Sequence, residues 1–217
     1  MKSKRSRSYY PVFLNISGRK CVMIGGEQIA LRKAKGLLES GANIEVISPD
    51  LCPELSELAE TGEINVLRRH YQAGDLQRAL ISIAATNNSD INQEVVKEAR
   101  RGGVLVNVAD DAEDSAFIVP SCLRRENITI AVPTAGSNPA LARKIRTRLE
   151  KDLGDEYASL SLLVEEVRSE LKRQGIKVNS DDWQKALDLD LIIDLLKQGN
   201  KERAKAALLN NLKALQK

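Results

Sequence analysis

The residues best suited to chemistry follow short apolar runs, at places where a strand is predicted to end. Gly25 and Gly26 come directly after the apolar residues 21–24, and a helical pattern begins at once. Such a turn opens the βαβ unit that binds dinucleotides, because glycines admit a pyrophosphate and the helix N-terminus supplies N–H groups. In the pattern G-x-G-x-x-(G/A), Gly25 and Ala30 match, whereas Glu27 replaces the middle glycine. Taken alone, the turn fits a nucleotide site and an ordinary βα turn equally well.

Two further stretches place small or polar residues after a predicted strand. Pro49 and Asp50 follow the strand predicted at 43–48, and Asp50 lies near the position where an acid holds the ribose hydroxyls of NAD. An N-cap of the following helix explains Asp50 equally well. Ala85 and Thr86 end an apolar strand, where small residues let a flat ligand approach. Both stretches are therefore candidate cofactor contacts.

Asp110 is the candidate general base. It follows the strand predicted at 104–108, so its carboxylate is expected at the carboxyl edge of the sheet, beside any nicotinamide at the switch point. A carboxylate there can take a proton while a hydride leaves the substrate. By position alone, Asp110 and Asp111 are more often plain loop acids. His70 is the single histidine, which excludes a histidine-rich metal site, and a solvated loop imidazole is the commoner outcome.

The elements that position these residues follow from hydrophobic periodicity. Apolar, β-branched runs alternate with helical patterns, which is typical of a doubly wound parallel sheet with Rossmann-type α/β architecture. The predicted strands cover 21–24, 43–48, 64–67, 79–85 and 104–108, and the predicted helices cover 28–40, 51–60 and 88–101. A parallel sheet brings the carboxyl ends of its strands to one edge, where the candidate residues would meet.

The pattern changes after residue 112. Residues 117–120 and 127–132 predict an antiparallel hairpin linked by 124–126. Asn138 and Pro139 are typical of the N-cap and first residue of a helix. From residue 155 the chain reads as helical, with an apolar stripe formed by Tyr157, Leu160, Val164, Val167 and Leu171.

Three domains are expected: 1–112 for NAD binding, 113–150 for dimerisation and, by the family resemblance described below, the substrate cleft, and 151–217 as a helical domain. A strand pair cannot bury both of its faces alone. We therefore expect 113–150 to form a homodimer interface, with packing onto helices of its own chain as the alternative.

Composition limits the class of protein. Of 217 residues, 42% are hydrophobic and 29% charged, values typical of globular proteins. No apolar run is long enough to span a membrane, and the basic N-terminus lacks the apolar region of a secretory signal. Three cysteines without a C-x-x-C pair indicate a reducing cytoplasm and disfavour a disulfide frame or a thiolate metal site. A net charge of +3 is too small to identify a partner, and neither nucleic acid nor membrane is expected.

Several motifs occur together in one order. They are Pro11-Val12-Phe13-Leu14, Ile24-Gly25-Gly26 with Ala30-x-Arg32-Lys33-Ala34, Ala84-Ala85-Thr86-Asn87 with Asn92, Asn107-Val108-Ala109-Asp110, Ser115-x-Phe117-Ile118-x-Pro120-Ser121, and Ala131-Val132-x-Thr134-x-Gly136-x-x-Pro139-x-Leu141-Ala142-Arg143. Together they resemble the precorrin-2 dehydrogenases, the siroheme synthase N-terminal family that includes bifunctional dehydrogenase/ferrochelatases. The resemblance covers roughly residues 9–152.

This resemblance implies NAD-dependent oxidation of precorrin-2, a tetrapyrrole, to sirohydrochlorin by a homodimer whose segment 113–150 interlocks with its partner. Asp110 matches the family's essential aspartate, the general base, which also takes part in metal insertion where that occurs. The expected cofactor contacts are Gly25, Gly26, Gln28, Ile29, Pro49, Asp50, Ala85 and Thr86, and the expected substrate contacts are Asn107, Thr134, Gly136 and Arg143. Arg124, Arg125, Arg143 and Arg146 would suit the substrate's carboxylates, although each is as easily a solvated charge.

One departure bears on the cofactor. Family members commonly carry three glycines where this chain has Gly25, Gly26 and Glu27. Two negative charges about 4 Å apart repel by roughly 4 kcal/mol at an effective dielectric near 20, or about a thousandfold in affinity, unless Glu27 turns into solvent. The alternative function is thus a family member with impaired NAD binding, acting only as a chelatase or tetrapyrrole-binding protein. A third alternative is a regulatory Rossmann module without catalysis.

Overall fold

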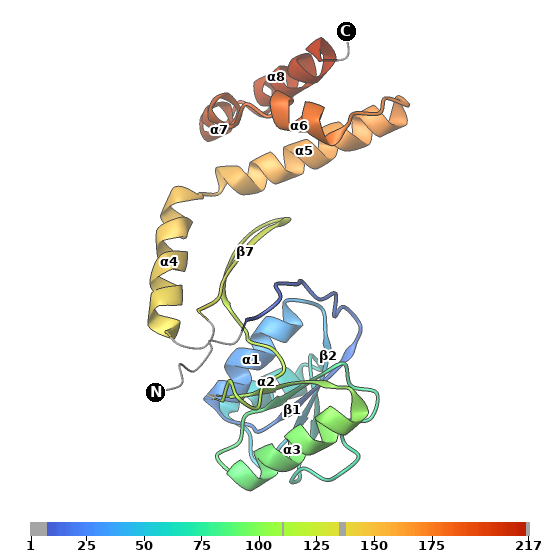
Figure 1. Cartoon of the computed structure of the whole chain (residues 1–217), viewed down its shortest axis with the longest axis vertical. Coiled ribbons are helices and arrows are strands. Elements are labelled where there is room, and N and C mark those ends of the chain that lie inside the picture. The colour runs from blue at the N-terminus through green and yellow to red at the C-terminus, as the bar shows by residue number, and fades with distance from the viewer. Residues whose placement is uncertain (1–7, 110, 135–137, 216–217) are drawn as a thin grey trace. The chain divides into compact units, whose positions relative to one another are not determined.

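The computed structural model describes residues 8–109, 111–134 and 138–215. The chain forms two compact units, residues 1–119 and 120–217, each with its own hydrophobic core (Figure 1). Within the described residues, no helix combines the length and apolar character that crossing a membrane requires.

The first unit is a five-stranded parallel sheet in the order β3-β2-β1-β4-β5. Its elements are β1 (Lys20–Ile24), α1 (Gln28–Leu38), β2 (Asn43–Ile47), α2 (Pro53–Glu60), β3 (Asn65–Leu67), β4 (Ile81–Ala84), α3 (Ser89–Gly102) and β5 (Leu105–Val108). The predicted doubly wound sheet is confirmed. Its order reverses between β1 and β4, so the switch point, where such sheets bind ligands, lies between these two strands.

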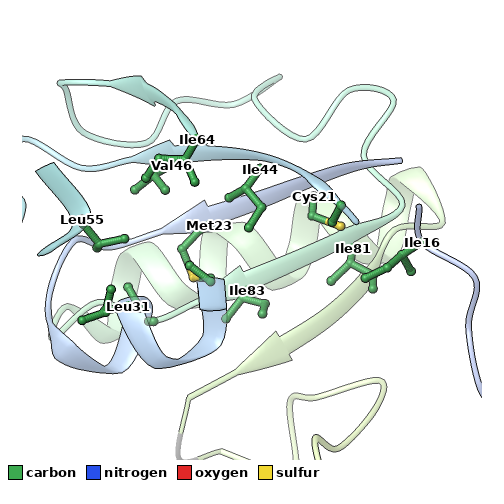
Figure 2. Packing of buried hydrophobic residues seen from close by; sticks show 14 residues of the cluster. Ile16, Cys21, Met23, Leu31, Ile44, Val46, Leu55, Ile64, Ile81 and Ile83 are labelled. Carbon is green, nitrogen blue, oxygen red and sulfur yellow. The ribbon is translucent and has the colours of Figure 1, made fainter. Parts of the chain in front are cut away.

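Both faces of this sheet are buried. Cys21 and Met23 of β1 lie in the core with α1 and α2 (Figure 2), whereas Val22 and Ile24 lie in the core with α3. Every residue of β4 is buried, as expected for a strand covered on both sides. A register slip would exchange the two sets of apolar side chains. The strand ends are therefore held in fixed positions, and the loops that follow them start from one rigid edge.

The second unit joins an antiparallel hairpin to five helices within the described residues. The elements are β6 (Ser121–Arg125), β7 (Ile128–Val132), α4 (Pro139–Asp152), α5 (Glu156–Arg173), α6 (Ser180–Ala186), α7 (Leu189–Lys197) and α8 (Lys201–Ala214). The apolar stripe of α5 packs against α7 and α8, and its Leu160, Val167 and Leu171 are buried as predicted. Asn138 caps α4 as expected, because its side chain accepts a hydrogen bond from the Leu141 N–H at 2.9 Å.

The predicted hairpin is correct in kind but wrong in register. Residues 117–120 form no strand, and the link is Glu126 and Asn127 rather than 124–126, since Arg125 pairs with Ile128. Glu126 takes a positive φ of 48°, as a tight two-residue turn requires. Pro120 has no N–H to give to a ladder. Phe117 instead packs against the core of the first unit.

Candidate active site

The loop after β1 touches the loop after β4. Gly25 has a φ of 117°, which only glycine adopts readily, and a Cβ on it would lie 2.3 Å from the Ala85 carbonyl oxygen. The Gly25 N–H donates to the Ile47 carbonyl at 3.0 Å, so the same residue also ties the end of β2. Gly25 is therefore required by the fold itself.

Gly26 admits the loop after β2. A Cβ there would lie 2.0 Å from the Asp50 carbonyl oxygen and 2.9 Å from Ser48 Oγ. The Ser48 hydroxyl donates to that same Asp50 oxygen at 2.7 Å, and the Cys52 N–H donates to the Gly26 carbonyl at 2.8 Å. The two glycines thus bring the loops after β1, β2 and β4 into backbone contact at one edge.

Asp50 is not a helix cap, so the structural alternative considered for it is wrong. The N-cap of α2 is Cys52, and Pro53 is its first residue. Asp50 is exposed, beside Pro49 at the carboxyl end of β2, where a carboxylate can receive ribose hydroxyls. Gln28, in the first turn of α1, donates through Nε2 to Glu54 of α2 at 3.2 Å.

The end of β4 is fixed onto α3. The Thr86 hydroxyl donates to Asn92 Oδ1 at 2.8 Å, and Asn92 Nδ2 donates back to the Thr86 carbonyl at 3.0 Å. Asn88 caps α3 by accepting from the Asp90 and Ile91 N–H groups at 2.9 and 3.2 Å. Asn88 is therefore the N-cap of α3, and Thr86 is held in a defined place at the edge.

Glu27 bridges the loops after β1 and β4. Its two carboxylate oxygens accept from Asn87 Nδ2 at 2.9 and 3.0 Å, across 60 residues of sequence. Glu27 is the N-cap residue of α1 but its side chain makes no capping hydrogen bond. Glu27, which replaces the middle glycine of the pattern, thus places a carboxylate at the switch point and holds it there by hydrogen bonds with Asn87.

Asn107 of β5 is a polar side chain buried on the α1 side of the sheet. It is 6% exposed, its Oδ1 accepts from Lys33 Nζ at 3.0 Å, and its Nδ2 donates to the Phe117 carbonyl at 3.0 Å. Lys33 was not among the site residues expected from the sequence, so its contact with β5 was missed. The one available signal was its place in the motif Ala30-x-Arg32-Lys33-Ala34.

The loop after β5 closes through Ser115, which is 9% exposed. Its hydroxyl accepts from the Val108 N–H at 2.9 Å and donates to the Asp111 carbonyl at 2.5 Å. The Asp111 carboxylate accepts from the Glu113 and Asp114 N–H groups at 2.8 and 3.1 Å. Asp110 belongs to this loop but lies outside the described residues, so its part in the site stays a prediction.

Comparison with known proteins identifies the family. Residues 12–121 match the family described as "Putative NAD(P)-binding". The chain belongs to this NAD(P)-binding family. Siroheme synthases of Chromobacterium violaceum and Nitrosococcus oceani are each 36% identical to it, over 92% of this chain and 43% of theirs. The chain therefore spans less than half the length of these curated relatives.

A solved structure, "SirC, precorrin-2 dehydrogenase", matches with a TM-score of 0.73 and 25% identity, over 95% of this chain and 100% of that one. The family and the Rossmann-type fold expected from the sequence motifs are thereby confirmed. The structural match covers both compact units, since it extends well beyond the NAD(P)-binding segment.

The residues of the first unit fit the dinucleotide that this family binds. The first turn of α1, with Gln28 and Ile29, carries backbone N–H groups that lack intrahelical partners and favour an anion. Asp50 is exposed at the end of β2, and the small Ala85 ends β4. The side chain that departs from the fit is Glu27.

The predicted substrate contacts divide between the two units. Asn107 lies in the first unit, whereas Thr134 and Arg143 lie in the second, and Gly136 is outside the described residues. The Thr134 hydroxyl donates to the Asn138 carbonyl at 3.0 Å, at the start of α4, and Arg143 is exposed on that helix. Thr134 therefore already has a structural partner next to the N-terminus of α4.

Two of the arginines considered as carboxylate partners have internal roles. Arg125 Nε donates to the Leu153 carbonyl at 3.1 Å and lies 3.6 Å from Asp155. Arg146 pairs with Glu150 one turn further along α4. Of the four arginines, Arg125 and Arg146 are therefore engaged in contacts within the chain, which favours a structural role over a contact with the substrate's carboxylates.

Proposed function

We propose that this protein catalyses the NAD-dependent oxidation of precorrin-2 to sirohydrochlorin in siroheme biosynthesis. The observation that carries the proposal is the likeness to a precorrin-2 dehydrogenase along the whole of that chain, combined with a dinucleotide edge built from β1, β2 and β4. Siroheme synthases among the relatives point to the same pathway.

The cofactor in this proposal is NAD. Asp50 stands where the ribose hydroxyls of a bound dinucleotide are received, and its negative charge disfavours the 2′-phosphate of NADP. Gly25, Gly26, Gln28, Ile29, Pro49, Asp50, Ala85 and Thr86 are the proposed cofactor contacts. In the first unit their backbones converge at the carboxyl edge of the sheet.

The oxidation removes two hydrogens from the substrate, one as a hydride and one as a proton. When bound, NAD supplies the hydride acceptor. In the proposal Asp110 receives the proton as general base. Lys33, Asn107 and Ser115 hold the ends of the loop that carries it, through the hydrogen bonds at the end of β5. In the proposal, the chain's own contribution is therefore a base carried by a loop whose neighbouring residues are tied to a rigid strand.

The substrate is a polycarboxylate, for which Thr134, Gly136 and Arg143 are the proposed contacts beside Asn107. We place the homodimer interface in 113–150. Leu141 and Ile145 of α4, 48% and 39% exposed in the single chain, support an interface there. The three-domain division at residues 112 and 150, and a cytoplasmic location, belong to the same proposal.

Anaerobic turnover tests this function. Purified protein is mixed with precorrin-2 and NAD, and the formation of NADH and sirohydrochlorin is followed by absorbance. Asp110→Asn, which keeps the size of the side chain but not its basicity, is expected to lower kcat at least a hundredfold, as loss of a general base does. Glu113→Gln, in the same loop, is the matched control and is expected to keep wild-type kcat. Undiminished turnover by Asp110→Asn would remove Asp110 from the mechanism.

A second candidate function is favoured by one observation, the carboxylate of Glu27 at the switch point. It is a family member without NAD turnover that acts as a chelatase or tetrapyrrole carrier. Calorimetric titration with NAD separates the two functions, because only the dehydrogenase requires binding. A regulatory module without catalysis would instead leave the absorbance of added sirohydrochlorin unchanged.

A further inference from the structure

The hydrogen-bonded pair of Glu27 and Asn87 lies where a dinucleotide must pass. After β1 the chain turns to α1 on one face of the sheet, and after β4 it turns to α3 on the other. The crevice between these two loops is the switch point, and a pyrophosphate bound there lies against the first turn of α1. Glu27 belongs to one loop and Asn87 to the other, so their hydrogen bonds span the switch point.

The hydrogen bonds between Asn87 and Glu27 are of the same chemical kind as those that Asn87 could donate to a pyrophosphate. The Asn87 amide donates to both oxygens of a carboxylate, at 2.9 and 3.0 Å. A pyrophosphate oxygen is an anionic acceptor of the same kind. The Glu27 carboxylate also stands at the N-terminus of α1, where the helix dipole favours negative charge. Glu27 therefore occupies both the donor and the electrostatic position that a phosphate would use.

Neither side chain is needed for the folds of the helices that flank the crevice. Glu27 makes no capping hydrogen bond for α1, and α3 is capped by Asn88 and not by Asn87. Both residues are exposed, so the bridge can open by side-chain rotation, which is fast. The backbone of Glu27 has a φ of −92°, which glycine and glutamine both adopt.

We infer that Glu27 is an internal competitor of the cofactor pyrophosphate, and that Asn87 is a pyrophosphate donor that Glu27 masks. This inference rests on the proposed NAD function and deepens it. NAD binds only after the carboxylate releases Asn87 and turns to solvent, so the affinity for NAD is lower than the rest of the site would give. Ligands without a pyrophosphate do not meet this competition.

Calorimetric titration of four variants of the 217-residue chain tests the inference: Glu27→Gln, Glu27→Gly, Asn87→Ala and the double variant Glu27→Gly/Asn87→Ala. The ligands are ADP-ribose, which contains the pyrophosphate, adenosine, which lacks it, and NAD. Glu57→Gln, on the exposed side of α2, removes the same charge away from the crevice and is the matched control.

We expect Glu27→Gln and Glu27→Gly to bind ADP-ribose and NAD about tenfold to a hundredfold more tightly, less than the unscreened thousandfold because Glu27 is solvated. Adenosine affinity should change by less than about twofold, as should every affinity of Glu57→Gln. In the Glu27→Gly background, loss of the Asn87 amide should lower the affinity for ADP-ribose several-fold. In the presence of Glu27, the same Asn87→Ala substitution should lower this affinity by a smaller factor.

Equal ADP-ribose affinity in wild type and both Glu27 variants would overturn the inference and leave the NAD function standing. An equal gain for adenosine would also overturn it, since the effect would then not concern the pyrophosphate. Failure of every variant to bind NAD or ADP-ribose would instead refute the proposed NAD function, and with it the inference.

Discussion

Replacing Gly26 by alanine tests the close backbone approach on which the candidate site depends. The added Cβ would lie 2.0 Å from the Asp50 carbonyl oxygen, 2.9 Å from Leu51 Cδ2 and 2.9 Å from Ser48 Oγ. Side-chain rotation can relieve the last two contacts but not the first, because the Asp50 oxygen belongs to the backbone. The loop after β2 must therefore move away from the loop after β1.

The cost follows from what that movement breaks. Overpacking of a tight contact costs about 1–3 kcal/mol. Loss of the hydrogen bond from the Cys52 N–H to the Gly26 carbonyl, 2.8 Å in the wild type, adds about 0.5–1.5 kcal/mol. We expect Gly26→Ala to lower the free energy of unfolding by about 2–4 kcal/mol. NAD affinity should fall as well, because the displaced loop carries Pro49 and Asp50.

Urea denaturation followed by far-UV circular dichroism measures this change. Trp183, the single tryptophan, lies in the second unit, so its fluorescence reports on that unit separately. Gly36→Ala is the matched control: Gly36 lies inside α1, nothing is within 4 Å of its added Cβ, and alanine favours a helix by about 1 kcal/mol. A Gly26→Ala protein as stable as wild type would refute the argument from close approach.

Two further predictions concern polar contacts. Lys33→Met removes the ammonium that donates a hydrogen bond to the buried Asn107, and a hydrogen bond from a charged group contributes about 1.5–3 kcal/mol. We therefore expect kcat to fall roughly tenfold to a hundredfold, while the Kd for NAD stays within about twofold. Lys35→Met on the same helix is the control, and an unchanged kcat in Lys33→Met would contradict the positioning role of Lys33. Hydrogen bonds from Lys205 and Lys201 lower the pKa of Glu166 to about 2. The stabilisation of the second unit by the Lys205–Glu166 pair is therefore complete above the ordinary pKa of 4.5 and is lost as the pH falls towards 2. Acid titration of the Trp183 signal should therefore show a weaker pH dependence in Lys205→Met, and identical curves would rule the pair out as its cause.

The local pattern of the chain was enough to predict most of the first unit. Apolar runs alternating with helical periodicity gave the five strands and three helices, because burial on both faces of a parallel sheet demands continuous apolar strands. Asn138 and Pro139 marked the start of α4 correctly, since capping depends on residues within one turn. Motifs in register also identified the family, which the comparisons confirm.

The local sequence pattern was not enough to predict which residues pair in the β6–β7 hairpin. Residues 117–120 are as β-prone as 121–125, and the choice between them depends on contacts made elsewhere. Phe117 packs on the core of the first unit and its carbonyl accepts from Asn107, which removes that segment from the hairpin. The strand then begins after Pro120, which cannot donate to the ladder.

Only the tertiary structure decided which residues meet at the carboxyl edge of the sheet. The sequence supplied the glycines and Asp50, each with a local explanation of equal weight, and a carboxylate at Glu27 in place of the middle glycine. Only the strand order sets β4 beside β1, which brings Asn87 to Glu27 and the Ala85 carbonyl to Gly25. It also sets β5 within reach of Lys33. Local sequence determines which elements form, whereas the functional contacts join residues far apart in the chain, and these exist only once the packed core has fixed which strands are neighbours.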